Sequence, residues 1–279
     1  MTLHQTLKVN NPDLWKHLIP RPHQNDHKYK RGSILIIGSV EMTGAACLAA
    51  EGCRRMGAGL ITILTQPQNA MVYRMHSPAY LVKEYTDHAS FNQIIQDPKY
   101  NAILIGPGMI ATEETKQLVI DILKLNKPVV LDAGAILCFK DSQELSQYSH
   151  SQVVITPHGA EFKQIFATIG SKVEHTQSAA TLTGSTIVHK GAETVIANPD
   201  ETTIINNHAP ASLAVGGTGD ILSGMIASLI GQKIEPINAA AIATWTHGEG
   251  AYSLKQIFTP EELAVAIGNV YNRFFETYD

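Results

Sequence analysis

The sequence has few cysteines and no long apolar run. Its three cysteines, Cys47, Cys53 and Cys138, form no CxxC pair, and their odd number leaves one thiol over. Such a sparse set is typical of a reducing compartment, so we expect a cytoplasmic protein. No segment approaches the roughly 20 apolar residues of a membrane span, and no apolar signal-peptide core occurs near the N-terminus.

Aromatic residues and net charge are also scarce. Aromatics make up 6% of the 279 residues, and the formal net charge is -4 at pH 7. A weakly acidic chain lacks the basic surface that binds nucleic acids and anionic membranes, and it has few rings for stacking on bases. We therefore expect a small-molecule substrate and neither a nucleic-acid nor a membrane partner.

Two familiar nucleotide-binding motifs are absent. The sequence contains no GxxxxGK[ST] P-loop, and no GxGxxG follows its first apolar strand. Any bound nucleotide must therefore be held by another kind of loop.

Short apolar runs alternate with helical patterns through most of the chain. Strands are expected at 33–38, 60–64, 102–106, 127–133 and 151–157, and helices at 43–56, 112–125, 219–230, 235–254 and 259–277. Alternation of this kind predicts an α/β fold, with a mostly parallel central sheet and helices on both faces. The closely spaced STIVHK, ETVIAN and TTIINN segments predict a few antiparallel edge strands. We find no linker or repeat, and we predict an N-terminal arm over 1–28 and a single domain over 29–279.

Glycines and polar residues collect directly after the predicted strands. GPG at 106–108, DAGA at 132–135, PHGAE at 157–161 and KGAET at 190–194 each follow one. The carboxyl ends of parallel strands form the sheet edge at which ligands bind, so we expect the functional site there.

The GGTGD segment at 216–220 opens an apolar helix. Its glycines allow the backbone to approach a ligand, and the free amides of the first helical turn suit a phosphate. A plain glycine-rich turn, with Asp220 as an ordinary first-turn residue, fits the pattern equally well.

Six short motifs occur in a fixed order: TGAACLAAEGCRRMGAGLIT (43–62), GPG (106–108), LDA (131–133), ITPHGAE (155–161), VHKGAET (188–194) and GGTGD (216–220). Together they resemble ribokinase-like small-molecule kinases and, more narrowly, the ADP-dependent NAD(P)H-hydrate dehydratases. The resemblance extends from about Lys28 to the C-terminus. It implies a ribokinase-like fold and the ADP-dependent return of S-NADHX and S-NADPHX to NADH and NADPH, giving AMP and phosphate.

The resemblance also implies roles for individual residues. Asp220 would be the catalytic base, and Mg²⁺ would be organised by Glu161. The hydrated substrate would contact Ala45, Gly108, His158 and Asp220. The nucleotide would be held by Lys190, Gly191, Ala192, Glu193, Thr194, Gly217, Thr218 and Gly219.

Each of these residues also has a purely structural interpretation. Ala45 can simply pack its helix on the sheet, and His158 can be a hydrogen-bonding residue at a helix entry. Lys190 can be a solvated charge at a strand end, and Glu161 can favour a helix N-terminus.

The sequence departs from the family pattern in one acidic motif. Relatives carry Asp-Ala-Asp-Ala after the fourth strand, whereas this chain has Gly134 at the position of the second aspartate. The resemblance further implies a homo-oligomer, expected to be a tetramer, and an NAD(P)HX epimerase as functional partner. Vitamin-precursor kinases, such as hydroxyethylthiazole or hydroxymethylpyrimidine kinase, are the alternative, although they carry cysteine at the position of Asp220. A non-catalytic nucleotide-binding protein is the remaining class.

Overall fold

The strands form one sheet in the computed structural model, which describes residues 6–22, 24–25, 27–200 and 202–276. They are β1 (Thr6–Val9), β2 (Ser33–Ile37), β3 (Leu60–Thr65), β4 (Leu81–Glu84), β5 (Ala102–Ile105), β6 (Val129–Leu131), β7 (Val153–Ile155), β8 (Thr186–His189), β9 (Thr194–Ala197) and β10 (Thr202–Asn206). Their order across the sheet is β1-β10-β9-β8-β7-β6-β5-β2-β3-β4.

The sheet is mostly parallel, as predicted. From β4 through β8 every neighbouring pair is parallel, with Leu35 opposite Ile103 at the centre. Strand β9 runs antiparallel to both β8 and β10, and β1 is again parallel to β10. The chain order reverses between β2 and β5, so the loops after these two strands diverge at the kind of point where α/β sheets bind ligands.

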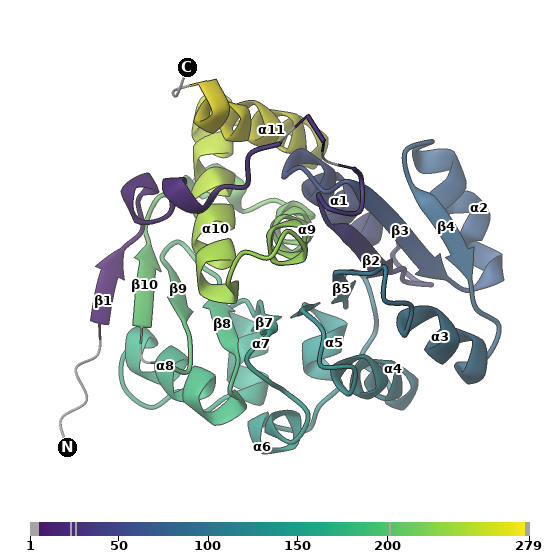
Figure 1. The fold of residues 1–279 in the computed structure, drawn as a ribbon. Coiled ribbons are helices and arrows are strands. Elements are labelled where there is room, and N and C mark those ends of the chain that lie inside the picture. The colour runs from purple at the N-terminus through teal and green to yellow at the C-terminus, as the bar shows by residue number, and fades with distance from the viewer. Residues whose placement is uncertain (1–5, 23, 26, 201, 277–279) are drawn as a thin grey trace.

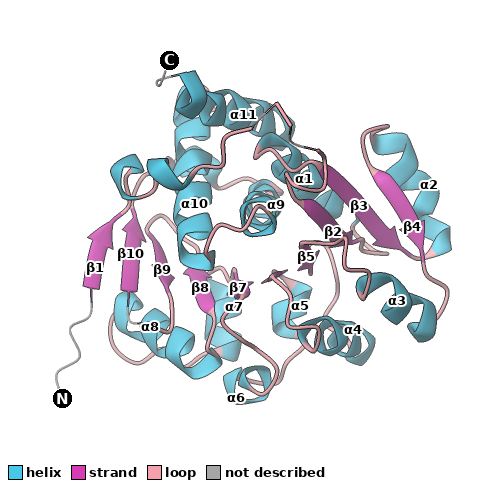
Figure 2. Ribbon diagram, in the orientation of Figure 1, coloured by secondary structure: helices cyan, strands magenta, loops and turns pink. Residues whose placement is uncertain are grey.

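Two layers of helices cover the sheet (Figures 1 and 2). On one face lie α1 (Thr43–Arg55), α9 (Thr218–Gly231), α10 (Pro236–Ser253) and α11 (Pro260–Glu276). On the other lie α3 (His88–Ile95), α4 (Glu113–Leu123), α5 (Gly134–Leu137), α6 (Ser142–Ser146), α7 (Gly159–Ile165) and α8 (Lys172–Thr183), while α2 (Pro67–His76) flanks β4. Short 3₁₀ turns occur at Pro12–Leu14, Lys16–Leu18 and Ala211–Leu213.

Alternate residues of the central strands contribute their side chains to two separate apolar cores. In β2, Ile34 and Ile36 pack with α1 and α9, whereas Leu35 and Ile37 pack with the opposite helices. Successive side chains of a strand point to opposite faces, so a strand covered on both faces must be apolar throughout. This explains the near-continuous apolar run SILII.

Helices α1 and α9 approach each other unusually closely. A Cβ built on Gly52 would lie 2.2 Å from the carbonyl oxygen of Ile221, and one on Gly224 would lie 1.9 Å from that of Ala49. Real atoms do not approach so closely, so only glycine fits at these two positions. The small residues of α1 therefore serve contact between two backbones within the domain.

The N-terminal segment packs on the domain. Strand β1 pairs with β10, and Trp15 is fully buried against Trp245 and Phe274. The Trp15 indole donates to Asn10 Oδ1 at 2.9 Å. A boundary at residue 28 stays a prediction, but residues 6–19 supply part of this sheet and core. The arm's residues 1–5, 23 and 26, and residue 277 of the last predicted helix, lie outside the described residues.

All three cysteines are free thiols. Burial raises the pKa of Cys47 to about 11, and that of Cys138 to about 12, so both stay protonated near neutral pH. Over the described ranges, no helix is both long and apolar enough to cross a membrane.

Candidate active site

The glycine-rich loop ends at the N-terminus of α9. Gly217 is the N-cap residue and has φ +94°, a left-handed conformation that favours glycine. The amide of Thr218 donates to Val215 and that of Ile221 to Gly217, while the amides of Gly219 and Asp220 have no partner among the described residues. Two free amides at a helix N-terminus form a site for an anion.

Asp220 lies in the first turn of α9 and is partly buried. Burial, reinforced by the negative charges of Asp132 and Glu161, raises its pKa to about 7, although the ammonium group of Lys190 opposes the shift. A carboxylate with a pKa near the working pH can take a proton and later release it. Asp220 therefore has the protonation behaviour of a general base.

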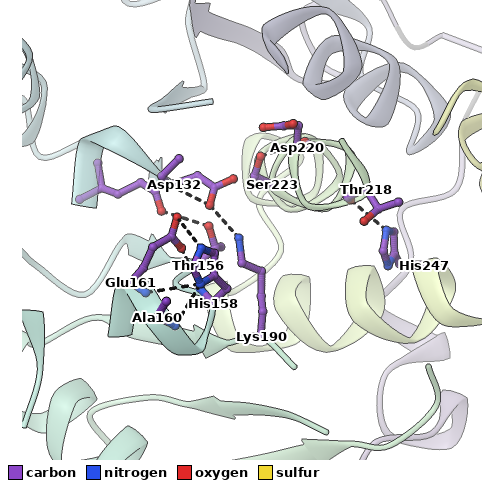
Figure 3. A network of polar contacts seen from close by, with 12 residues as sticks. Asp132, Thr156, His158, Ala160, Glu161, Lys190, Thr218, Asp220, Ser223 and His247 are labelled. Carbon is purple, nitrogen blue, oxygen red and sulfur yellow. Dashed lines mark hydrogen bonds and ion pairs between the residues drawn. The ribbon is translucent and has the colours of Figure 1, made fainter. Parts of the chain in front are cut away.

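Lys190 lies between the strand ends and α9 (Figure 3). Its Nζ is 2.9 Å from Asp132 Oδ1, and its side chain is 17% exposed. Burial alone would lower the pKa of Lys190, but the carboxylates of Asp132, Glu161 and Asp220 hold it above its ordinary value. The lysine is therefore a permanent cation at neutral pH.

Lys190 also faces the glycine loop. A Cβ built on Gly219 would lie 3.6 Å from Lys190 Nζ, an ordinary contact distance. The ammonium group and the free amides thus border the same space, where both would attract a phosphate.

His158 and Glu161 cap the N-terminus of α7. The ring Nδ1 of His158 accepts from the amides of Ala160, at 3.0 Å, and Glu161, at 3.4 Å; Glu161 Oε2 accepts from the amide of His158 at 2.8 Å. This reciprocal pair is a capping box. The structural interpretation of both residues is therefore confirmed. The His158 side chain is also 54% exposed, and its Nε2 lies 3.4 Å from Glu161 Oε1.

Ala45 and Gly108 come together at the divergence of β2 and β5. A Cβ on Gly108 would lie 3.0 Å from Ala45 Cβ and 2.4 Å from the carbonyl oxygen of Met42, and Gly108 has φ +73°. Ser39 Oγ donates to the Gly108 carbonyl at 2.6 Å. The α1 entrance and the GPG loop thus form one tightly packed surface at the predicted sheet edge.

The segment after β8 is open to solvent. Gly191, Ala192 and Glu193 are exposed, whereas Thr194 begins β9 and is buried. Lys172 Nζ donates to the carbonyl oxygen of Glu193 and lies 3.5 Å from that of Lys190. The segment therefore presents exposed backbone beside Lys190.

The side chain and carbonyl of Thr218 both make hydrogen bonds within the protein. Its hydroxyl donates to the carbonyls of Leu213 and Val215, both at 2.9 Å, and its carbonyl lies 3.0 Å from His247 Nε2. Burial, with help from the positive charge of Lys190, lowers the pKa of His247 to about 4, so a neutral ring donates to Thr218. These bonds fix the first turn of α9.

The missing second aspartate has a steric explanation. A Cβ built on Gly134 would lie 2.1 Å from the carbonyl oxygen of Met109. The loop after β5 occupies the place where a side chain would stand, so this backbone accepts only glycine at residue 134.

Sequence analysis placed Asp132 at the sheet edge but gave it no role. It directly follows β6, is 2% exposed and pairs with Lys190. An ionisable residue directly after a buried apolar strand was the available signal, because such a residue must have a partner.

Similarity to solved structures identifies the class of protein to which this chain belongs. The chain matches a ribokinase-like superfamily protein from Enterococcus faecalis with a TM-score of 0.84, 25% identity and 96% coverage of both chains. The N-terminus of α9 with its two free amides, the adjacent Asp220 carboxylate and the Lys190 ammonium group lie at the expected sheet edge. The fold is therefore that of a ribokinase-like protein, and the candidate site lies at its ligand-binding sheet edge.

The family is narrower than that class. A family model described as NAD(P)H-hydrate dehydratase matches residues 33–271, and the chain belongs to this family. It is 32% identical over 253 residues to the ADP-dependent (S)-NAD(P)H-hydrate dehydratase of Bacillus subtilis, covering 88% of each. A structure of ADP/ATP-dependent NAD(P)H-hydrate dehydratase from B. subtilis, co-crystallised with ATP and Mg²⁺, matches with a TM-score of 0.81 and 28% identity, over 96% of this chain and 98% of that one.

Other relatives are longer. The chain spans about half the length of the bifunctional NAD(P)H-hydrate repair enzymes that it matches, for example 46% of the one from Synechocystis.

Proposed function

We propose that this protein is a hydro-lyase that dehydrates S-NADHX and S-NADPHX to NADH and NADPH, with ADP as co-substrate and AMP and phosphate as products. The observation that carries the proposal is the placement of Asp220 and the Lys190 ammonium group beside the free amides of α9. Membership of the dehydratase family identifies the reaction that this constellation would serve.

The first step is a phosphoryl transfer. Hydroxide is a poor leaving group, so the hydroxyl of the hydrate must first become a phosphate ester. Asp220 accepts the hydroxyl proton while the oxygen bonds to the β-phosphorus of ADP, and the bond from that phosphorus to the AMP oxygen breaks. Lys190 and the α9 amides hold the negative oxygens of the moving phosphoryl group.

The second step is an elimination. The electron pair of the ring nitrogen expels phosphate from the neighbouring carbon, and loss of a proton from the next carbon restores the ring double bond. NADHX and ADP thus become NADH, AMP and phosphate, and the hydrate supplies the water that is consumed. The acceptor in the first step, Asp220, needs its proton removed before the next turnover, which a pKa near 7 permits.

The remaining predicted residues have supporting positions. We propose that the hydrate contacts Ala45, Gly108 and His158 as well as Asp220, because Ala45 and Gly108 form one surface and the His158 ring is accessible. The nucleotide would lie along residues 190–194 and 217–219, where exposed backbone borders Lys190.

Glu161 would hold Mg²⁺ through water. Among the described residues, there is no group of three metal-binding side chains. Mg²⁺ fits such a site, because it commonly binds one or two carboxylates together with waters and substrate phosphates. When bound, it would neutralise charge on the phosphate oxygens, while Glu161 also caps α7.

A product analysis tests the proposal. Incubation with NADHX, ADP and Mg²⁺ should restore the absorbance of the reduced nicotinamide and give AMP and inorganic phosphate in equal amounts by phosphorus NMR. A persistent phosphomonoester from a thiazole or pyrimidine alcohol, with no AMP from NADHX, would instead support the vitamin-precursor kinase alternative. That alternative has less support, because the relative named as a dehydratase is covered over most of its length.

The need for an epimerase partner follows from the stereochemistry of the substrate. An enzyme selective for the S form should stop halfway in a racemic hydrate mixture, and added NAD(P)HX epimerase should carry conversion to completion. Full conversion without epimerase would reject both the S selectivity and the need for this partner.

A homo-oligomer, with a tetramer as the expected state, also belongs to the proposal. Exposed apolar side chains gather on α2 and β4, where Met71, Val72, Met75 and Leu81 are 49–80% exposed. An open edge strand beside such side chains suits contact with a second copy. Light scattering that gives a monomer mass at every concentration would reject it. The cytoplasmic location stays a prediction.

A further inference from the structure

We infer that Asp132 is a positioning residue, whose carboxylate holds Lys190 Nζ at the first turn of α9 so that the ammonium group faces the transferring phosphoryl group. This role rests on the proposed function and assigns a residue that the family resemblance did not supply.

The backbone holds Asp132 from both sides. Its amide donates to the Ile105 carbonyl at 3.1 Å, and its own carbonyl oxygen lies 1.7 Å from where a Gly106 Cβ would be. The next residue, Ala133, has φ +43° and ψ -118°, an unfavourable conformation for alanine. Such strain persists only where the surrounding structure over-determines it, so the backbone directly after Asp132 is held in one conformation.

The side chain is fixed as well. Asp132 Oδ1 accepts from the Ala133 amide at 3.1 Å and from Lys190 Nζ at 2.9 Å. Its side chain is 3% exposed, so water cannot substitute for the lysine. Lys190 would otherwise be a flexible chain of four methylenes, whose ammonium group could lie in several places.

The pair also sets the charge around Asp220. The charged groups that act on Asp220 are Asp132 from the end of β6, Lys190 from the end of β8 and Glu161 from α7. The neutral His247 of α10 lies behind the same helical turn. Asp132 raises the pKa of Asp220, whereas Lys190 lowers it. Removing the Asp132 charge would leave the Lys190 charge less compensated, so the pKa of Asp220 would fall.

Two variants separate the effect of the position of the Asp132 carboxylate from the effect of its charge. Asp132→Asn removes the charge at nearly constant shape, and we expect kcat to fall roughly 10- to 100-fold. The acid limb of its kcat/KM profile should move to a pH roughly one unit lower. Asp132→Glu keeps the charge but displaces it by one methylene, so the acid limb should stay in place while kcat remains low. Thermal unfolding shows that each variant is folded.

The matched control is Asp97→Asn. It removes the carboxylate from another aspartate–lysine pair, in which Asp97 Oδ2 lies 2.6 Å from Lys99 Nζ. This variant should keep both the wild-type kcat and the wild-type pH profile. A merely structural role for Asp132 would lower thermal stability without moving the acid limb.

Titration of the Asp220 carboxyl carbon by NMR, in the unliganded protein, gives a readout independent of turnover. We expect Asp132→Asn to lower the apparent pKa and Asp132→Glu to leave it near its wild-type value. If NADHX proves not to be a substrate, the proposed function fails while this titration still tests the Asp132 role. An unchanged Asp220 titration in Asp132→Asn, or a kcat within about twofold of wild type, would overturn the inference.

Discussion

The two faces of the sheet are built in different ways. On the α1–α9 face, glycines bring two helical backbones together, and added atoms would meet carbonyl oxygens. On the opposite face, large side chains such as Phe91 and Phe162 fill the space between helices and strands. A core of this second kind tolerates changes of shape, whereas backbone contact tolerates no extra volume. Asp220 lies on α9 and therefore on the face that tolerates no extra volume. The close backbone contact between α1 and α9 keeps its helix in one position.

The largest expected effect is at the α9 entrance. Gly219→Val should abolish nucleotide-dependent turnover, because its branched side chain would crowd Lys190 Nζ and cover the free amides. Gly219→Ala should fold and keep measurable activity, because a single Cβ has room there. Turnover of NADHX with ADP, together with thermal unfolding, makes the comparison. A folded valine variant with normal turnover would show that this loop does not hold phosphate.

Asp220→Asn comes next. We expect kcat to fall roughly 10²- to 10⁴-fold with little change in ADP affinity, because the general base is lost while the anion site remains. In the wild type, kcat/KM should rise with pH through about 7, as the carboxylate forms. Steady-state kinetics and calorimetry measure the two quantities, and near wild-type turnover of the variant would refute the assignment.

The same variant makes a stability prediction. Burial raises the pKa of Asp220 in the folded protein to about 7, whereas an aspartate in the unfolded chain has an ordinary pKa of 3.8. The native state therefore binds more protons between these values, and this residue makes the wild type less stable as pH rises across them. Asp220→Asn should raise Tm clearly at pH 8 and little at pH 4. Equal shifts at both pH values would contradict the raised pKa.

Gly224→Val tests the glycine contact directly. The new Cβ would lie 1.9 Å from the Ala49 carbonyl oxygen, so we expect a loss of about 1–3 kcal/mol in the free energy of unfolding. Gly44→Ala, in the exposed first turn of α1, has no atom within 4 Å of its Cβ and should be neutral or slightly stabilising. Urea unfolding compares the two variants, and equal stability would mean that α1 and α9 separate at little cost.

The smallest effect should be on the opposite face. Phe91 is fully buried and packs edge-on against Tyr85, with ring centroids 5.1 Å apart. Phe91→Leu should cost less than about 1.5 kcal/mol, because the neighbouring side chains can repack around a smaller apolar group. A loss larger than that of Gly224→Val in the same urea experiment would reverse the comparison between the faces.

The central strands could be predicted because burial on both faces requires continuous apolar runs, as in SILII and VVI. Strands β1 (TLKV) and β4 (LVKE) were not predicted. Both are largely exposed and border the sheet. TLKV alternates over only four residues and LVKE does not alternate, so neither gives a distinct strand signal. Their pairing depends on distant neighbours, which local pattern does not reveal.

The location of the site was predictable, but its internal contacts were not. Strand ends identified the sheet edge that carries Asp132, His158, Glu161 and Lys190. The ion pair between Asp132 and Lys190 joins residues 58 positions apart, and it exists because β6, β7 and β8 are neighbours in the sheet. Likewise, the sequence shows that Gly134 replaces the family's second aspartate but not why. The structure explains it, because the loop after β5 lies where a side chain at residue 134 would be.

The contact between α1 and α9 has a consequence for motion. Helix α1 carries Ala45 and α9 carries Asp220, and their interlocked backbones leave no room to slide past each other. The two helices must therefore travel as one rigid body. A displacement of Ala45 would therefore displace Asp220 as well, whereas the exposed 191–193 turn and the His158 ring belong to other elements and would not have to follow.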